Sequence, residues 1–140
     1  MALVQVESNL FIGNVADFGS SSTLQARSVV LSIVCHGSRG FGHTGSSVGQ
    51  AAFNIGEDGN SPEWFIRGIV DVLLRAYGSR VISVHDGSGG LSIGAFILSC
   101  MRAQSATQTY VQGKAWLDAL VSDALLIPSA LDTQGARYWN

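Results

Sequence analysis

Residues 84–98 read VHDGSGGLSIGAFIL and join two apolar segments through a glycine-rich loop. The apolar residues 81–84 precede the loop, and a second apolar run begins near Leu91. A strand, a glycine-rich loop and a helix in this order place free backbone N–H groups at the helix start, where they can bind an anion. The loop nevertheless contains Asp86 and no Lys or Arg. The sequence therefore predicts an anion-binding backbone without a basic side chain.

The rest of the chain supplies the other elements of an α/β fold. Continuous apolar or β-branched segments predict strands at residues 3–6, 10–13, 29–35, 52–55 and 81–84. Helices are predicted at 24–27, 91–102, 107–114 and 116–124, and residues 36–50 are predicted to form an irregular loop. We expect one α/β domain over residues 1–140, with a mainly parallel central sheet flanked by helices.

A further helix is predicted to begin at Ser61 and Pro62 and to end at Gly78. Apolar residues recur at helical spacing along it and predict its buried face; they are Trp64, Phe65, Ile69, Val72, Leu73 and Tyr77.

The composition argues against several functional classes. Hydrophobic residues make up 46% of the chain and charged residues only 13%, against about 25% charged residues in an average protein. A net charge of −2 gives no electrostatic reason to bind nucleic acid, and no apolar run is long enough to predict a membrane helix. No secretory signal is visible, so we expect an intracellular protein with reduced thiols at Cys35 and Cys100. Low charge and high apolar content favour a surface that binds protein partners.

Three familiar motifs fit the sequence poorly. Residues 90–94 match the G-x-S-x-G of hydrolases, but that fold needs a histidine after the serine, and His85 is the last histidine. Residues 40–45 match the G-x-G-x-x-G of dinucleotide-binding proteins, but residues 46–50 are a poor helix start. No pair of candidate metal ligands has a recognised spacing; the candidates are Cys35, His36, His43, His85 and Asp86. We expect no metal and no cofactor.

The order of elements resembles the dual-specificity branch of the protein tyrosine phosphatase family. That family has a strand, the signature His-Cys-x-x-Gly-x-x-Arg and then a helix. Residues 81–85 match its strand and histidine, Gly89 matches the signature glycine, and residues 94–98 are similar to the helix. Upstream, residues 55–58 and 61–65 resemble its general-acid loop and the helix that follows, and Asp58 corresponds to the acid. Residues 9–13 resemble its opening strand and residues 128–134 its closing segment.

The signature itself departs from the family at two positions. Asp86 stands where the family has the nucleophilic cysteine, and Ser92 stands where it has the arginine. Phosphoryl transfer by this route needs a thiolate nucleophile and a guanidinium that holds the phosphoryl oxygens. The resemblance therefore implies a degenerate anion loop with a vestigial acid at Asp58. The loop comprises His85, Asp86, Gly87, Ser88, Gly89, Gly90, Leu91 and Ser92.

These departures predict a pseudophosphatase without catalytic residues. We expect it to act as a protein-interaction or scaffold subunit of a larger assembly, with the Asp86 carboxylate filling the position that a substrate phosphate would take. Two alternatives stay open. The loop can retain weak binding of a phosphorylated or anionic ligand, or the protein can be an active hydrolase that uses Asp86 or Ser92.

Overall fold

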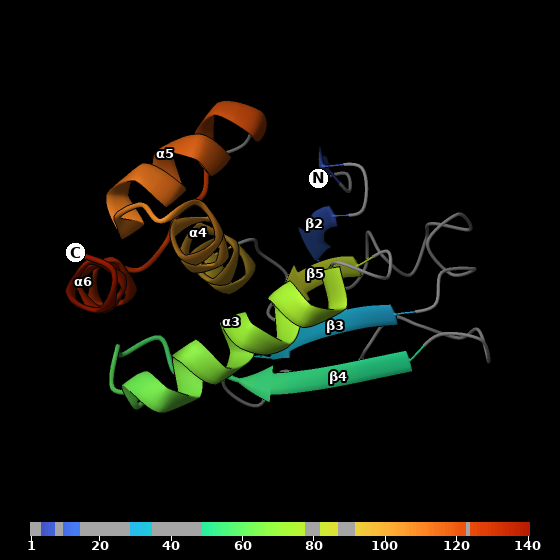
Figure 1. Ribbon diagram of the computed structural model, residues 1–140, viewed down its shortest axis with the longest axis horizontal. Coiled ribbons are helices and arrows are strands. Elements are labelled where there is room, and N and C mark those ends of the chain that lie inside the picture. The colour runs from blue at the N-terminus through green and yellow to red at the C-terminus, as the bar shows by residue number, and fades with distance from the viewer. Residues whose placement is uncertain are drawn as a thin grey trace.

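The computed structural model describes residues 4–7, 10–14, 29–34, 49–77, 82–86, 92–122 and 124–140. Five described strands form one sheet in the order β1-β2-β5-β3-β4 (Figure 1). Their bounds are Val4–Glu7 for β1, Leu10–Asn14 for β2, Val29–Val34 for β3, Gly49–Asn54 for β4 and Ile82–Asp86 for β5. β1 pairs antiparallel with β2, whereas β2, β5, β3 and β4 run parallel to one another. β5 thus lies inside the sheet, with a parallel neighbour on each side.

The described helices gather around α4, which lies at the centre of the helical layer (Figure 1). The four helices are α3 (Glu63–Tyr77), α4 (Ser92–Ala106), α5 (Tyr110–Leu120) and α6 (Ser129–Tyr138). α4 contacts the other three helices as well as β2 and β5, and every residue from Ile93 to Met101 is buried. A helix with such a wide apolar surface requires cover on most sides. The described elements form the small α/β domain that the sequence predicts.

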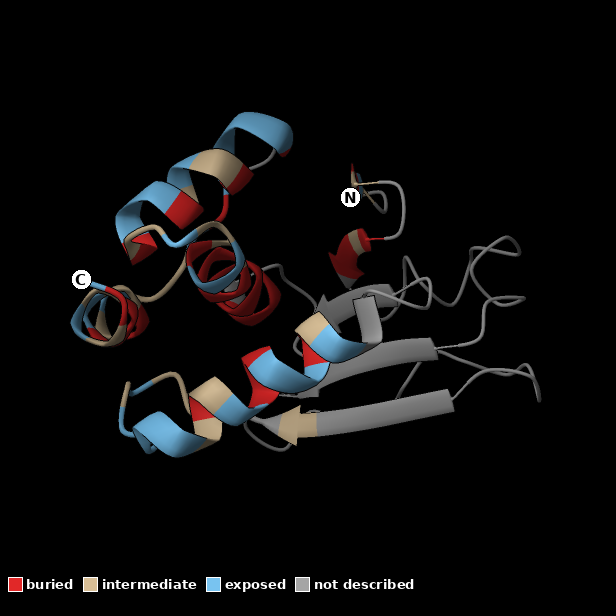
Figure 2. Ribbon diagram, in the orientation of Figure 1, coloured by how far each residue is buried: buried red, intermediate tan, exposed pale blue. Residues whose placement is uncertain are grey.

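The predicted buried face of α3 is partly wrong. Ile66, Ile69, Val70 and Leu73 are the residues that face the core. Trp64 and Val72 are instead 75% and 44% exposed. Figure 2 shows buried and exposed segments alternating along α3. On a helix with 3.6 residues per turn, both residues lie far from the direction in which Ile66 and Val70 point. Apolar spacing alone fits either face of α3, and packing against α4 selects the face that carries Ile66 and Val70.

A single α5 replaces the two helices that the sequence predicts over residues 107–124. Thr109 caps its start, because the Gln112 backbone N–H donates to Thr109 Oγ1 at 3.2 Å and the Thr109 N–H donates to Gln112 Oε1 at 3.0 Å. This reciprocal pair is a capping box. Residue Thr107, which we expected to be helical, has a positive φ of 54°. The helix then passes residue 115 without interruption.

Several other boundaries differ from the prediction. β4 begins at Gly49, inside the expected loop, and ends before Ile55, which is buried beyond the strand. α3 begins after Pro62, whose carbonyl accepts hydrogen bonds from the backbone of Phe65 and Ile66, so Pro62 takes the place expected for Ser61. α4 continues to residue 106, one turn further than expected. The predicted helix at 24–27, most of the predicted loop at 36–50 and Cys35 lie outside the described residues, whereas Cys100 is a buried free thiol, as expected.

The C-terminal residues are fastened to α3 through Arg67. Its guanidinium donates to the Tyr138 carbonyl and to Gln104 Oε1, and it lies 4.6 Å from the centre of the Trp139 ring. The Trp139 indole N–H donates to the same Gln104 oxygen at 2.9 Å. Cation–π contact and charge-assisted hydrogen bonds thus act on one side chain. Arg67 therefore links α3, α4 and the segment after α6.

Candidate functional site

The predicted anion loop lies between the central strand and the central helix. His85 and Asp86 are the last two residues of β5, and Ser92 is the first residue of α4. Residues 87–91, which complete the predicted loop, lie outside the described residues. Parallel α/β sheets bind ligands beyond the carboxyl ends of their strands, where neighbouring connections leave in opposite directions. The ends of the predicted loop therefore lie where this class of fold places a ligand site.

The strand register brings a further polar residue to the carboxyl ends of the parallel strands. Asn14 ends β2 and pairs in register with Asp86, and on the other side of β5 Ile33 pairs with Asp86. Our sequence reasoning did not select Asn14. A polar residue directly after the apolar segment 10–13 is the signal that could have identified it.

The amino end of α4 directs backbone N–H groups toward the segment that precedes it. The first N–H groups of a helix have no partner within the helix, and they carry the positive end of its dipole. All residues from Ile93 to Cys100 are buried, and the Ser99 hydroxyl is satisfied by the Ala95 carbonyl at 2.7 Å. A helix held this firmly presents its amino end in a fixed direction. This backbone feature suits an anion, whatever the neighbouring side chains are.

Asp58 follows the carboxyl end of β4, and Asp86 is at the carboxyl end of β5, so both lie at the same end of the parallel strands. Ile33 pairs with both Phe53 of β4 and Asp86 of β5, so Phe53 and Asp86 are separated by two strand spacings, about 10 Å. Asp58 follows Phe53 by five residues, and its side chain is exposed. Its carboxylate accepts a hydrogen bond from the Asn60 backbone N–H at 2.9 Å. In this structure Asp58 stabilises its own turn.

The turn that contains Asp58 is held by α6. Gly59 has a φ of +73°, and a Cβ placed there would lie 2.7 Å from the Ala130 carbonyl oxygen. The Ser61 carbonyl accepts hydrogen bonds from Gln134 Nε2 at 2.6 Å and from the Tyr138 hydroxyl at 3.2 Å. Because glycine adopts this φ without strain and leaves room for the helix, α6 fixes the turn closely.

Comparisons with known proteins test this arrangement. No family model and no curated protein matches the sequence. Among solved structures, human DUSP28 is similar over 99% of this chain and 93% of its own, with 14% identity and a TM-score of 0.79. A leucine rich repeat and phosphatase domain containing protein from Entamoeba histolytica gives 12% identity and a TM-score of 0.71, over 98% of this chain and 90% of its own.

The human tyrosine phosphatase-like serine/threonine/tyrosine-interacting protein is also similar, with 13% identity and a TM-score of 0.68 over 99% of both chains. The chain has the fold of the dual-specificity phosphatases. At these identities the similarity establishes the phosphatase-like fold alone. The predicted roles of His85, Asp86, Ser92 and Asp58 within that fold stay predictions.

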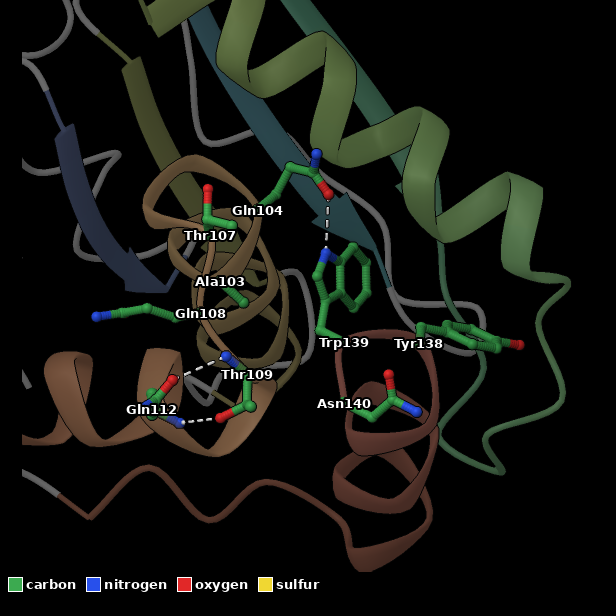
Figure 3. Close-up of a pocket in the computed structure, with 9 residues that line it drawn as sticks. All are labelled: Ala103, Gln104, Thr107, Gln108, Thr109, Gln112, Tyr138, Trp139 and Asn140. Carbon is green, nitrogen blue, oxygen red and sulfur yellow. Dashed lines mark hydrogen bonds between the residues drawn. The ribbon is translucent and has the colours of Figure 1, made fainter.

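A pocket of about 390 Å³ lies elsewhere in the phosphatase-like fold, between the end of α4, the start of α5 and the C-terminal residues (Figure 3). Its lining is neutral and mostly polar, and it comprises Ala103, Gln104, Thr107, Gln108, Thr109, Gln112, Tyr138, Trp139 and Asn140. The hydrogen bonds drawn in Figure 3 join lining residues to one another, Trp139 to Gln104 and Thr109 to Gln112. These groups hold the helix ends together, and none of the predicted site residues lines the pocket.

A charged network joins α5 and α6, and sequence reasoning did not find it. The Tyr110 hydroxyl donates to one oxygen of Asp132 at 2.6 Å, and Lys114 Nζ donates to the other at 2.9 Å. Burial, followed by the hydrogen bond from the hydroxyl to the carboxylate, raises the pKa of Tyr110 well above its ordinary value. The phenol therefore stays protonated and acts as a donor. Burial also raises the pKa of the Cys100 thiol, which makes it a poor nucleophile.

The described residues contain no group of three His, Cys, Asp or Glu side chains that could hold a metal ion. The candidate ligands Cys35, His36 and His43 lie outside those residues, as do the side chains of His85 and Asp86. Within the same described ranges, no helix is long and apolar enough to cross a membrane.

Proposed function

We propose that this protein is a catalytically inactive, phosphatase-like domain that acts as a protein-interaction or scaffold subunit. One observation carries the proposal. Residues 86–92, from the last residue of β5 to the first residue of α4, read DGSGGLS and contain no Cys, Lys or Arg. If the resemblance to the phosphatase signature holds, this segment lacks both the cysteine and the arginine of that signature.

The replacements oppose catalysis on physical grounds. A carboxylate at position 86 is a weak nucleophile toward phosphorus, and it repels an incoming phosphate dianion. Two unit charges 4 Å apart interact by about 4 kcal/mol at an effective dielectric of 20. Ser92 can donate one neutral hydrogen bond, but it supplies neither the charge nor the two-pronged geometry of an arginine. Asp58 has no leaving group to protonate if no nucleophile attacks.

An interaction role is supported by the surface of the described residues. Trp64, Val111 and Leu126 are 75%, 66% and 81% exposed, although each side chain is large and apolar. Only 13% of the residues are charged, so few charged side chains are available to solvate the surface around these apolar residues. One structural neighbour carries the words "tyrosine phosphatase-like" and "interacting protein" in its name. These facts favour a domain that works by contact.

Activity assays test the inactive state directly. We expect no turnover of aryl phosphates or phosphopeptides by the native chain, and no change on Ser92→Ala or Cys100→Ser. The double variant Asp86→Cys, Ser92→Arg restores the two missing groups and should bind vanadate or phosphate; Asp86→Ser, Ser92→Lys is its matched control. Native turnover that Asp86→Ala or Ser92→Ala abolishes would show an active hydrolase and refute the proposal.

The scaffold role needs its own experiment. The tagged native chain, purified from its source organism at low salt, should carry a second protein in fixed proportion. The double variant Asp86→Cys, Ser92→Arg should retain that protein, because the proposed contact does not use phosphate chemistry. Recovery of the chain with no other protein, at every salt concentration, would contradict the scaffold role while leaving the inactive state intact.

Retained anion binding is the second candidate, and the amino end of α4 favours it. The helix begins directly after a glycine-rich segment, and helix starts of this kind attract anions. The competing possibility is that the Asp86 carboxylate itself fills the anion position at the amino end of α4. In that case Asp86→Ala should lower the stability of the fold, and sulfate should stabilise this variant more than it stabilises the native chain. An equal sulfate response in both proteins would exclude this occupancy. Strong stabilisation of the native chain by phosphate would favour the binding candidate.

A further inference from the structure

The outer face of α3 presents an ordered row of four exposed residues. Trp64, Gly68, Asp71 and Arg75 are all exposed, and their spacings of four, three and four residues place them within an arc of about 60° on a helix. Buried Ile66, Ile69 and Val70 lie on the other side of the helix. Spacings of four and three residues set side chains on one face of a helix, so these four residues can meet one facing helix together. We call these four residues the α3 row.

The row contains both an apolar anchor and a recess. Trp64 is 75% exposed, and the neighbouring Val72 widens the apolar strip. A Cβ built on Gly68 would meet nothing within 4 Å, so another chain can approach the helix backbone closely there. Among the described residues neither Asp71 nor Arg75 takes part in an ion pair, although Glu63 and Arg67 on the same helix pair with each other. Asp71 and Arg75 are exposed, so a partner can reach both charges.

The row is complementary to itself when two copies meet in antiparallel orientation. A two-fold axis midway between residues 69 and 70 sets Trp64 of one copy opposite Arg75 of the other, and Gly68 opposite Asp71. The first pairing is a cation–π contact, which occurs twice by symmetry. In the second pairing, the Asp71 carboxylate lies beside Gly68, which has no side chain, so the carboxylate stays hydrated. A parallel arrangement would instead place Arg75 against Arg75 and Asp71 against Asp71.

We propose that the α3 row is a self-association surface through which two copies of this chain form an antiparallel, two-fold symmetric dimer. The proposal goes beyond the catalytic state of the phosphate loop and does not depend on it. One short helix per copy buries little area, and interfaces below about 1,200 Å² are usually weak. The dimer should therefore form at micromolar or higher concentration and exchange rapidly with monomer.

Sedimentation equilibrium of the full chain from about 1 to about 500 µM tests the proposal in the range where weak dimers dissociate. The native mass should rise toward that of a dimer. Trp64→Ala and Arg75→Glu should each weaken association by about tenfold or more, because either change removes both symmetry-related contacts between Trp64 and Arg75. Leu120→Ala is the matched control, since it removes an exposed apolar side chain of another helix, and it should leave the association constant unchanged.

A charge exchange tests the orientation. Trp64→Arg should abolish association, because it sets two arginines opposite each other. Adding Arg75→Glu to that variant should restore it, because each introduced arginine would then face a glutamate of the other copy. Circular dichroism should show every variant folded, since the changes are at exposed positions. A native chain that stays monomeric throughout, a dimer insensitive to Trp64 and Arg75 variants, or a double variant without recovery would each overturn the proposal.

Discussion

Replacing Gly113 by alanine tests the close contact between α4 and α5. A Cβ on Gly113 would lie 2.2 Å from the Ser99 carbonyl oxygen and 3.1 Å from the Ala103 nitrogen. Both atoms belong to the backbone of α4, so neither can move aside as a flexible side chain would. Relief of the first contact requires α5 to move away from α4 by more than about 1 Å before the two atoms reach ordinary contact distance. That movement would loosen the cover of the central helix.

Two opposing effects set the size of the change. Alanine favours a helix interior over glycine by about 1 kcal/mol. Overpacking in a well-packed core typically costs about 1–3 kcal/mol, and a backbone clash belongs at the upper end of that range. We therefore expect Gly113→Ala to lower the free energy of unfolding by about 1–2 kcal/mol, taking the difference of these two effects.

Gly68→Ala is the matched control, because the same chemical change in α3 meets nothing within 4 Å. It should raise the free energy of unfolding by about 0.5–1 kcal/mol. Urea unfolding followed by circular dichroism measures both variants, at a protein concentration low enough for the monomer. A Gly113→Ala variant as stable as the native chain would show that the α4–α5 contact is looser than described and would refute the reasoning.

Three further changes probe α6 and the turn before α3. Gly59→Ala combines a φ of +73° with a Cβ only 2.7 Å from the Ala130 carbonyl oxygen, and it should lower the melting temperature more than an exposed Gly→Ala change does. Asp132→Ala leaves the Tyr110 hydroxyl without its partner and should lower the free energy of unfolding by about 1–3 kcal/mol; Lys114→Met, which keeps that hydrogen bond, should cost less. The raised pKa of Tyr110 means that the folded chain retains a proton that the unfolded chain releases above about pH 10. Stability should therefore fall as pH rises beyond that value, and the urea midpoint of Tyr110→Phe should fall less between pH 9 and 11 than that of the native chain.

The sequence predicted those elements whose own residues favour one secondary structure. The β-branched segment that became β3, and the glycines between β5 and α4, carry their own structural preference. The start of α5 was also readable, since Thr109 followed by Gln112 is a capping pattern. We predicted two helices there because apolar periodicity alone does not locate a helix start.

The features that sequence reasoning missed depend on residues far apart in the chain. α6 contains few apolar residues, and its place is fixed by contacts with Ser61 and Tyr110. The exposure of Trp64 likewise follows from which face of α3 meets α4. For the candidate site, the sequence predicted the strand–helix junction but not Asn14, because strand register is a product of the assembled sheet.

The hold that α6 exerts on Ser61 has a consequence for how the chain matures. The hydrogen bonds from Gln134 and Tyr138 span 73 and 77 residues, respectively. During synthesis, the strand β4 and the turn after it leave the ribosome long before α6 exists. Because contacts of large sequence separation form late, that turn stays unfastened until residues 129–138 emerge. If synthesis stops before α6, the nascent domain should therefore lack the fixed turn that places Asp58 at the same end of the parallel strands as Asp86.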